Sequence, residues 1–135
     1  MALMTWSDKD SVGVEALDIQ HRAFMKILNE LHAASMRGKA REIAGPLLRQ
    51  LASLASEHFS LEERLMESTG FSGLAEHRAQ HRELTVKFAE FVSRHEKGDA
   101  AMYTPLLYFI RDWLNKHMQN EDRKYASWLS TQVVK

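Results

Sequence analysis

Two short stretches of this sequence repeat a spacing that suits metal binding. His58 and Glu62 lie four residues apart, and His77 and His81 have the same separation. Four residues are about one turn of a helix, so the two side chains of each pair point in the same direction. Each stretch therefore offers two donor atoms on one face of a helix.

The composition limits what such a site can contain. The chain has 135 residues, seven histidines and no cysteine. Disulfides, thiolate zinc sites, iron–sulfur clusters and cysteine nucleophiles are excluded, so nitrogen and oxygen atoms must bind any metal. Eighteen basic residues balance eighteen acidic ones, and a neutral chain lacks the electrostatic attraction for nucleic acid. We expect no nucleic-acid partner.

Apolar segments of the kind that enter membranes are also missing from the sequence. The first residues, MALMTWSDKDSVG, have no long apolar core of a signal peptide, and no apolar run approaches the roughly 18 residues of a membrane helix. We expect no membrane insertion and a cytoplasmic location. The length fits a single domain over residues 1–135, which we expect to be a monomer.

The elements that position the candidate residues are predicted to be helices. Apolar residues recur at separations of three and four, and glycine and proline are few. Long helices joined by short loops predict an all-α fold, an antiparallel up-down-up-down four-helix bundle preceded by an N-terminal arm. The predicted ranges are 1–13 for the arm and about 15–37, 41–68, 73–96 and 104–131 for the helices.

Proline marks the start of two of these helices. Pro46 lies either in the first turn of the second helix or at a kink in a longer helix. Thr104 followed by Pro105 predicts that the fourth helix begins there, with threonine as the N-cap. The second helix therefore begins either just before Pro46 or well before it, whereas the fourth has a single predicted start.

In an antiparallel bundle, polar residues from all four helices can meet at one height. Candidates near the start of the first and third helices lie level with candidates near the end of the second and in the second half of the fourth. His32 and His95 lie about 16 Å and 21 Å away from this level along their helices, so they cannot reach it. The seven candidates for one internal site are His21, His58, Glu62, His77, His81, His117 and Asp122.

So many buried polar side chains need partners. Each unpaired group would cost about 1 to 3 kcal/mol, and a lone carboxylate far more. Seven donors exceed the four of a structural zinc site, but they fit two octahedral ions with bridging carboxylates and a bridging oxygen species. One coordination position then stays open, and imidazole with carboxylate suits iron, so a small molecule such as dioxygen could bind. Five separate core histidines, the alternative, would not account for the carboxylates at the same level.

Four fragments together resemble the hemerythrin family, and in particular its single-domain bacteriohemerythrins. They are LDIQH at 17–21, HFSLEE at 58–63, HRAQH at 77–81 and HMQNED at 117–122. The resemblance implies two iron ions per chain, bridged by Glu62, Asp122 and an oxo or hydroxo group. It also implies that His77, His81 and His117 bind one iron, and that His21 and His58 bind the other, which keeps the open position for dioxygen.

Helix geometry alone would choose another acidic residue on the fourth helix. Glu121 lies four residues after His117, whereas Asp122 lies five residues after it and points about 140° away on a regular helix. Because the hemerythrin pattern has the bridging aspartate at the fifth position, we choose Asp122 and predict a local widening of the helix, such as a π-bulge. Leu114 and Met118, on the same helix, are expected to line the oxygen pocket.

The expected function is reversible dioxygen binding, for storage or for delivery to an oxygen-consuming enzyme, and not catalysis beyond weak side oxidation or peroxide turnover. A di-iron oxidase or peroxidase is one alternative. Ferritin-like oxidases carry Glu-x-x-His on two helices, and this motif does not occur in the sequence. Oxygen or redox sensing through a partner is a second alternative, which the sequence leaves open.

Overall fold

The computed structural model describes residues 3–11 and 14–133, without the side chains of residues 9, 119–121 and 129–133. Residues 1–2, 12–13 and 134–135 of the predicted arm and domain lie outside the described residues. Within the described part of the chain, every regular element is a helix.

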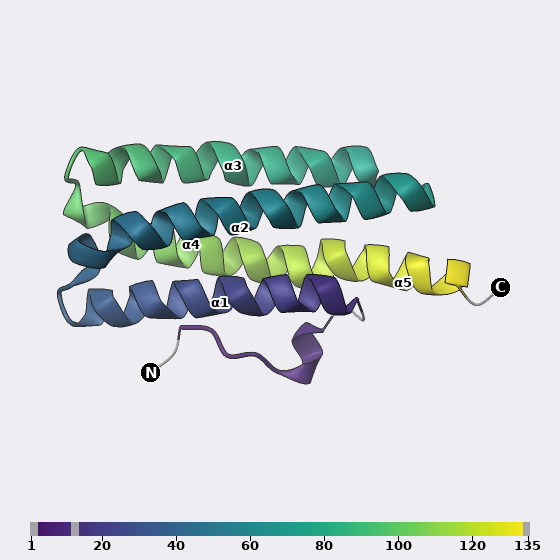
Figure 1. Cartoon of the computed structure of the whole chain (residues 1–135), viewed down its shortest axis with the longest axis horizontal. Helices are drawn as coiled ribbons and strands as arrows, with labels where there is room; N and C mark the ends of the chain where they lie inside the picture. Colours follow the sequence, from purple (N-terminus) through teal and green to yellow (C-terminus); the bar gives the residue numbers. More distant parts are fainter. Residues whose placement is uncertain (1–2, 12–13, 134–135) are drawn as a thin grey trace.

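Four long helical segments form the body of the molecule. They are α1 (Glu15–Met36), α2 (Ala40–Thr69), α3 (Leu74–Glu96), and a fourth segment made of α4 (Tyr103–Lys116), the π-helix η3 (His117–Asp122) and α5 (Arg123–Val133). Successive segments run in opposite directions (Figure 1). The α1–α2 and α3–α4 links lie at one end of the bundle, and the α2–α3 link lies at the other. The predicted antiparallel four-helix bundle is confirmed.

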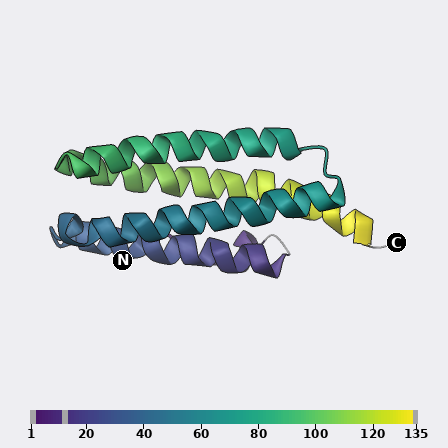
Figure 2. The ribbon, with the colours of Figure 1, turned by 45° about the horizontal axis from the view of Figure 1, so that its top comes forward.

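The segments pack as a closed ring of neighbours. α1 contacts α2 and α4, and α3 contacts the same two helices, as the second view also shows (Figure 2). The N-terminal arm lies along α1 (Figure 1). The Met4 N–H donates to Asn29 Oδ1 at 2.9 Å, and Asn29 Nδ2 donates to the Met4 carbonyl at 2.8 Å. This pair of hydrogen bonds attaches the arm to α1.

Glycines explain where two of the helices end, whereas the proline of α2 does not mark its start. Gly38 and Gly70 follow α1 and α2 with φ values of 69° and 74°, in the left-handed region that glycine adopts without steric cost. Pro46 lies inside α2. The longer of the two predicted starts is therefore correct, and α2 begins at Ala40.

The fourth helix begins within one residue of its predicted start at about residue 104, but Thr104 is not its N-cap, which is Met102. α4 already begins at Tyr103, directly after the short 3-10 helix η2 (Ala100–Met102). The side chain of Asp99 accepts a hydrogen bond from the Ala101 N–H at 3.0 Å. Because this aspartate caps the preceding turn, the chain enters the helix before the threonine.

The apolar core lies toward the end of the bundle that holds the α1–α2 and α3–α4 links. Leucine side chains from different helices dominate it, and burying one of them fully contributes about 1.5 to 3 kcal/mol. Those at most 6% exposed include Leu28, Leu31, Leu47, Leu51 and Leu106. At the opposite end, Leu17, Met66 and Tyr125 are also fully buried, so apolar packing continues beyond the polar side chains described below.

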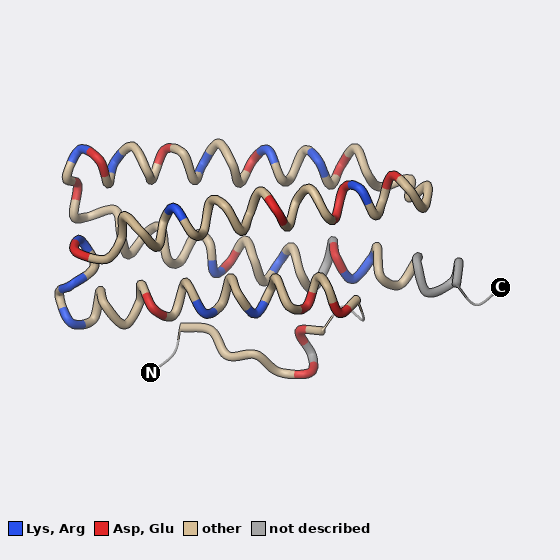
Figure 3. The backbone as a smooth tube through the Cα atoms, viewed as in Figure 1, with Lys and Arg blue, Asp and Glu red and all other residues tan. Residues whose placement is uncertain are grey.

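Charged residues of both signs are interspersed along the helices (Figure 3), in keeping with the formal net charge of zero. None of the helices described is both long and apolar enough to cross a membrane.

Candidate metal centre

The seven predicted side chains meet at the end of the bundle that holds the α2–α3 link. Five of them come from α1, α2 and α3, and the remaining two, His117 and Asp122, come from the π-helix. None of the seven is more than 3% exposed. They are His21, His58, Glu62, His77, His81, His117 and Asp122. The antiparallel order of the helices, which sets these residues at one height, is the reason that they converge.

Glu62 lies between two groups of histidines. Its Oε1 atom is 3.0 Å from His81 Nε2 and 3.1 Å from His117 Nε2, and it also contacts His77 Nε2. Its Oε2 atom is 3.0 Å from His58 Nε2. The two oxygens of this carboxylate therefore face different sets of imidazoles.

Asp122 divides its oxygens between the same groups. Its Oδ1 atom is 2.9 Å from His117 Nε2 and 3.1 Å from His77 Nε2. Its Oδ2 atom is 2.7 Å from His21 Nε2 and 3.8 Å from His58 Nε2. Both carboxylates thus lie between a group of three histidines and a group of two.

These contacts define two sets of four possible metal donors, which share Glu62. Within each set, one donor atom from every residue lies within 4.8 Å of the others. Neighbouring ligands of an octahedral ion with bonds of about 2.1 Å are about 3.0 Å apart, close to most of the nitrogen–oxygen distances observed. The two sets are Glu62, His77, His81 and His117, and His21, His58, Glu62 and Asp122.

Hydrogen bonds do not satisfy the donors of the second set. His21 Nε2, His58 Nε2, Glu62 Oε2 and both Asp122 oxygens are buried without a hydrogen-bond partner in the described part of the chain. His21 Nε2 and Asp122 Oδ2 nevertheless approach to 2.7 Å. Each such buried atom costs about 1 to 3 kcal/mol, whereas a metal ion would satisfy all of them together. The donors therefore fit a metal.

The electrostatics of the metal-free site point the same way. Burial raises the pKa of Glu62, but the charges of His58 and His117 outweigh it and hold this pKa well below its usual value. Burial lowers the pKa of His117, but Asp122 and Glu62 raise it overall to about 10. The pKa of His77 is likewise raised to about 9, by the same two carboxylates against burial. Without a metal, the site holds protons where cations would bind.

The π-helix determines how the fourth segment enters the site. His117 and Asp122 are the first and last residues of η3, so the predicted widening of this helix is confirmed. The side chain of Glu121, the geometric alternative, is outside the described side chains. Beyond the π-helix, the Tyr125 hydroxyl lies 3.2 Å from Thr69 Oγ1, and this contact attaches α5 to the end of α2.

Two polar residues around the site were missed from the sequence. His58 Nδ1 lies 2.8 Å from Gln20 Oε1, and His81 Nδ1 lies 2.8 Å from Glu63 Oε2. Such contacts set the proton on Nδ1 and leave Nε2 for a metal. The sequence gives only one indication of their role, which is that Gln20 and Glu63 stand next to predicted ligands in LDIQH and HFSLEE. This indication is weak, because adjacent side chains on a helix point about 100° apart.

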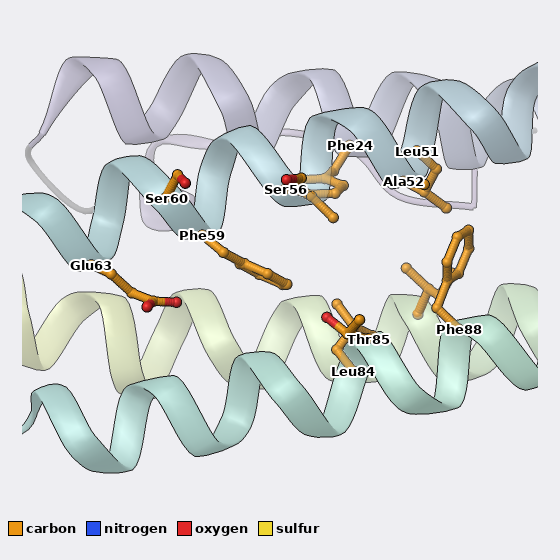
Figure 4. Close-up of a pocket in the computed structure, with 12 residues that line it drawn as sticks. Phe24, Leu51, Ala52, Ser56, Phe59, Ser60, Glu63, Leu84, Thr85 and Phe88 are labelled. Carbon is orange, nitrogen blue, oxygen red and sulfur yellow. The ribbon is translucent and has the colours of Figure 1, made fainter.

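An apolar cavity of about 320 Å³ lies beside the site, between α2 and α3 (Figure 4). Phe59, one of its walls, stacks on the His81 ring with centroids 3.9 Å apart and planes at 10°. Phe24, another wall, packs edge-on against His58 at 5.6 Å. Leu114 and Met118, the predicted pocket residues, are buried in the apolar core. The cavity is therefore separated from the donors by aromatic rings.

His95 has a different role, at the far end of the bundle. Its Nδ1 atom lies 2.7 Å from the Tyr103 hydroxyl, near the α3–α4 link. Neither His95 nor His32 belongs to the two donor sets found among the described residues, as their heights along the helices predict.

A buried pair of nitrogen and oxygen donor sets inside an antiparallel four-helix bundle defines the molecule as a metal-binding bundle protein. The Hemerythrin HHE cation binding domain family matches residues 12–129. The chain therefore belongs to the hemerythrin family, a di-iron, oxygen-binding family.

Individual relatives agree over nearly the whole chain. A bacteriohemerythrin of Methylococcus capsulatus is 33% identical over 131 residues, which are 96% of this chain and 99% of the relative. A myohemerythrin of Riftia pachyptila is 32% identical over 120 residues, 89% of this chain and 88% of the relative. A crystal structure of wild-type hemerythrin superposes with a TM-score of 0.85 at 31% identity, covering 93% of this chain and 97% of that one.

Proposed function

We propose that this chain binds dioxygen reversibly at a pair of iron ions, and that it stores oxygen or delivers it to an oxygen-consuming enzyme. One observation carries the proposal. Glu62 and Asp122 each direct one oxygen toward the three-histidine group and the other toward the two-histidine group. A carboxylate in this position is suited to bridge two ions, and a single ion would not use both of its oxygens in this way.

The proposal assigns the ligands unequally. His77, His81 and His117 bind one iron, and His21 and His58 bind the other. Glu62 and Asp122 bridge the pair together with an oxo or hydroxo group. Because the second iron has fewer histidines, its coordination shell keeps one position for dioxygen. An iron pair held by these seven residues would supply the two electrons that reversible dioxygen binding requires.

The surrounding side chains favour release over further reaction. All seven proposed ligands are at most 3% exposed, and Phe24 and Phe59 pack directly on two of the histidines. An apolar surrounding keeps water and its protons away from the bound gas. We propose Leu114, which is buried about one turn before His117, and Met118, which is buried directly after it, as walls of the oxygen pocket.

A binding role is preferred to an enzymatic one. The sequence has no Glu-x-x-His motif, which ferritin-like oxidases carry on two helices. A single domain over residues 1–135, a monomeric state and a cytoplasmic location remain expectations from the sequence.

Anaerobic reconstitution with ferrous iron tests the proposal. The protein should bind about two irons per chain, and admitting and removing oxygen should produce and remove a visible charge-transfer band over repeated cycles. Irreversible oxidation on the first exposure, or binding of a single zinc ion in place of two irons, would contradict the proposal.

Two histidine variants serve as a matched pair. His77→Ala should lose or weaken one iron, because His77 contacts both bridging carboxylates. His95→Ala should keep two irons and the same spectrum, because its imidazole partners Tyr103 at the other end of the bundle.

A further inference from the structure

Two of the proposed iron ligands have hydrogen-bond partners of different charge. His81 Nδ1 lies 2.8 Å from the carboxylate of Glu63, which extends from α2 in Figure 4. His58 Nδ1 lies 2.8 Å from the side-chain amide oxygen of Gln20. The distances are the same, but one acceptor is an anion and the other is neutral. His81 belongs to the three-histidine group, and His58 belongs to the two-histidine group.

Glu63 is kept charged and oriented by an arginine of α3. Arg78 Nε donates to Glu63 Oε1 at 3.0 Å, which leaves Glu63 Oε2 for His81. The same guanidinium donates from Nη2 to Glu67 Oε2 at 3.4 Å. The Glu63 side chain is 27% exposed and that of Glu67 is 70% exposed. The carboxylate next to the imidazole is therefore the more shielded of the two.

The charge of the acceptor affects how strongly an imidazole donates to a metal. A carboxylate that accepts the Nδ1–H pulls on this proton and makes Nε2 more electron-rich, whereas a neutral amide does so less. A more electron-rich ligand stabilises the higher oxidation state of its iron. The two histidine groups thus differ in two ways. They have unequal numbers of histidines, and the hydrogen-bond acceptors behind those histidines differ in charge.

We infer that Glu63 is a positioning residue that fixes His81 and biases the iron of the three-histidine group toward the ferric state. Gln20 fixes His58 without this bias, so the iron with the open position is the easier one to keep ferrous. The first electron withdrawn from the reduced pair then comes from the three-histidine iron. The inference rests on the proposed di-iron function.

Three charge variants of the full-length, iron-loaded protein test the inference in a spectroelectrochemical titration, in which an electrode withdraws the electrons. Glu63→Gln should shift the first oxidation equilibrium toward the ferrous state by about tenfold, or about 59 mV for one electron. Gln20→Glu should shift the potential in the opposite direction. Glu67→Gln, the matched control, removes the same charge from the same arginine but not from a histidine, and should leave the potential unchanged.

The zinc-loaded protein provides a readout that does not depend on oxygen binding. Zinc is diamagnetic, so the Nδ1–H resonance of His81 is observable by NMR. Loss of the carboxylate in Glu63→Gln should shift this proton resonance to lower frequency, whereas Glu67→Gln should leave it in place. If Glu63→Gln fails to fold, Gln20→Glu tests the same relationship from the other iron.

The outcomes separate the two proposals. Fewer than two irons in the wild-type protein would overturn the proposed function, and this inference with it. Two irons per chain together with equal potentials for Glu63→Gln and Glu67→Gln would overturn the inference alone. An unchanged His81 resonance in Glu63→Gln would do the same.

Discussion

His117 and Asp122 lie five residues apart, yet His117 Nε2 and Asp122 Oδ1 are only 2.9 Å apart. A regular α-helix would direct these side chains about 140° away from each other. The intervening backbone is a π-helix over His117–Asp122, in which hydrogen bonds join residues five apart. The widened turn returns the fifth residue to the face of the first, and both side chains can then reach the same group of donors.

Exchange of the acidic residues in this turn should separate the two candidates for the bridge. We expect Asp122→Asn to bind fewer than two irons per chain, because it removes a carboxylate that contacts both histidine groups. Glu121→Gln should retain two irons. Metal analysis after anaerobic loading measures both. The reverse result would assign the bridge to Glu121.

Metal-free protein should lose stability as the pH rises above about 6.5. The pKa values of His77 and His117 are raised from 6.5 to about 9 and about 10 in the folded state. The folded chain therefore holds more protons than the unfolded chain between these values, and the free energy of unfolding falls as the pH passes through this window. Urea denaturation at pH 6.5 and 9.5, followed by circular dichroism, measures the change.

His117→Gln is the control for this pH dependence. It removes one of the two raised groups, so the difference in stability between pH 6.5 and 9.5 should shrink. A wild-type urea midpoint that stays constant or rises across the window would contradict the assigned protonation of the site.

Removal of the Phe59 ring should open the site to water. The ring stacks on His81 at 3.9 Å and also lines the apolar cavity, so Phe59→Ala connects the cavity to the donors. We expect the oxygenated form to decay several-fold faster, as followed by loss of its visible band. Phe88→Ala enlarges the same cavity from α3 and should change the decay less. Equal decay of the two variants would show that the ring is not a barrier.

A core substitution at the other end should separate stability from metal binding. Leu106 is fully buried, and Leu106→Ala should lower the free energy of unfolding by about 2 to 5 kcal/mol with two irons still bound. Tyr108→Ala, at a side chain that is 43% exposed, should have a much smaller effect. Chemical denaturation and metal analysis on the same samples measure both quantities. A loss of iron in Leu106→Ala would show that the two ends are coupled.

The sequence predicted those features that depend on period and height along a helix. His21 and His81 are examples, because each interrupts an apolar stripe whose direction is set by the helix alone. Asp122 needed the family pattern, since regular helix geometry favoured Glu121. The predicted N-cap at Thr104 was wrong because the capping side chain, Asp99, acts on a turn before the helix.

Contacts between helices were harder to predict. Gln20 and Glu63 stand beside proposed ligands in the sequence, but their partners, His58 and His81, lie on neighbouring helices. Which polar neighbour meets which imidazole depends on the rotation of one helix against the next, and periodicity within one helix contains no information on this rotation. The apolar cavity between α2 and α3 escaped prediction for the same reason.

The separation of the leucine cluster from the metal centre along the bundle has a consequence for how the protein acquires its metal. The leucine cluster around Leu28 and Leu106 supplies hydrophobic stabilisation that requires no ion, while protons on His77 and His117 neutralise the carboxylates at the other end. Folding and metal loading can therefore occur as separate events.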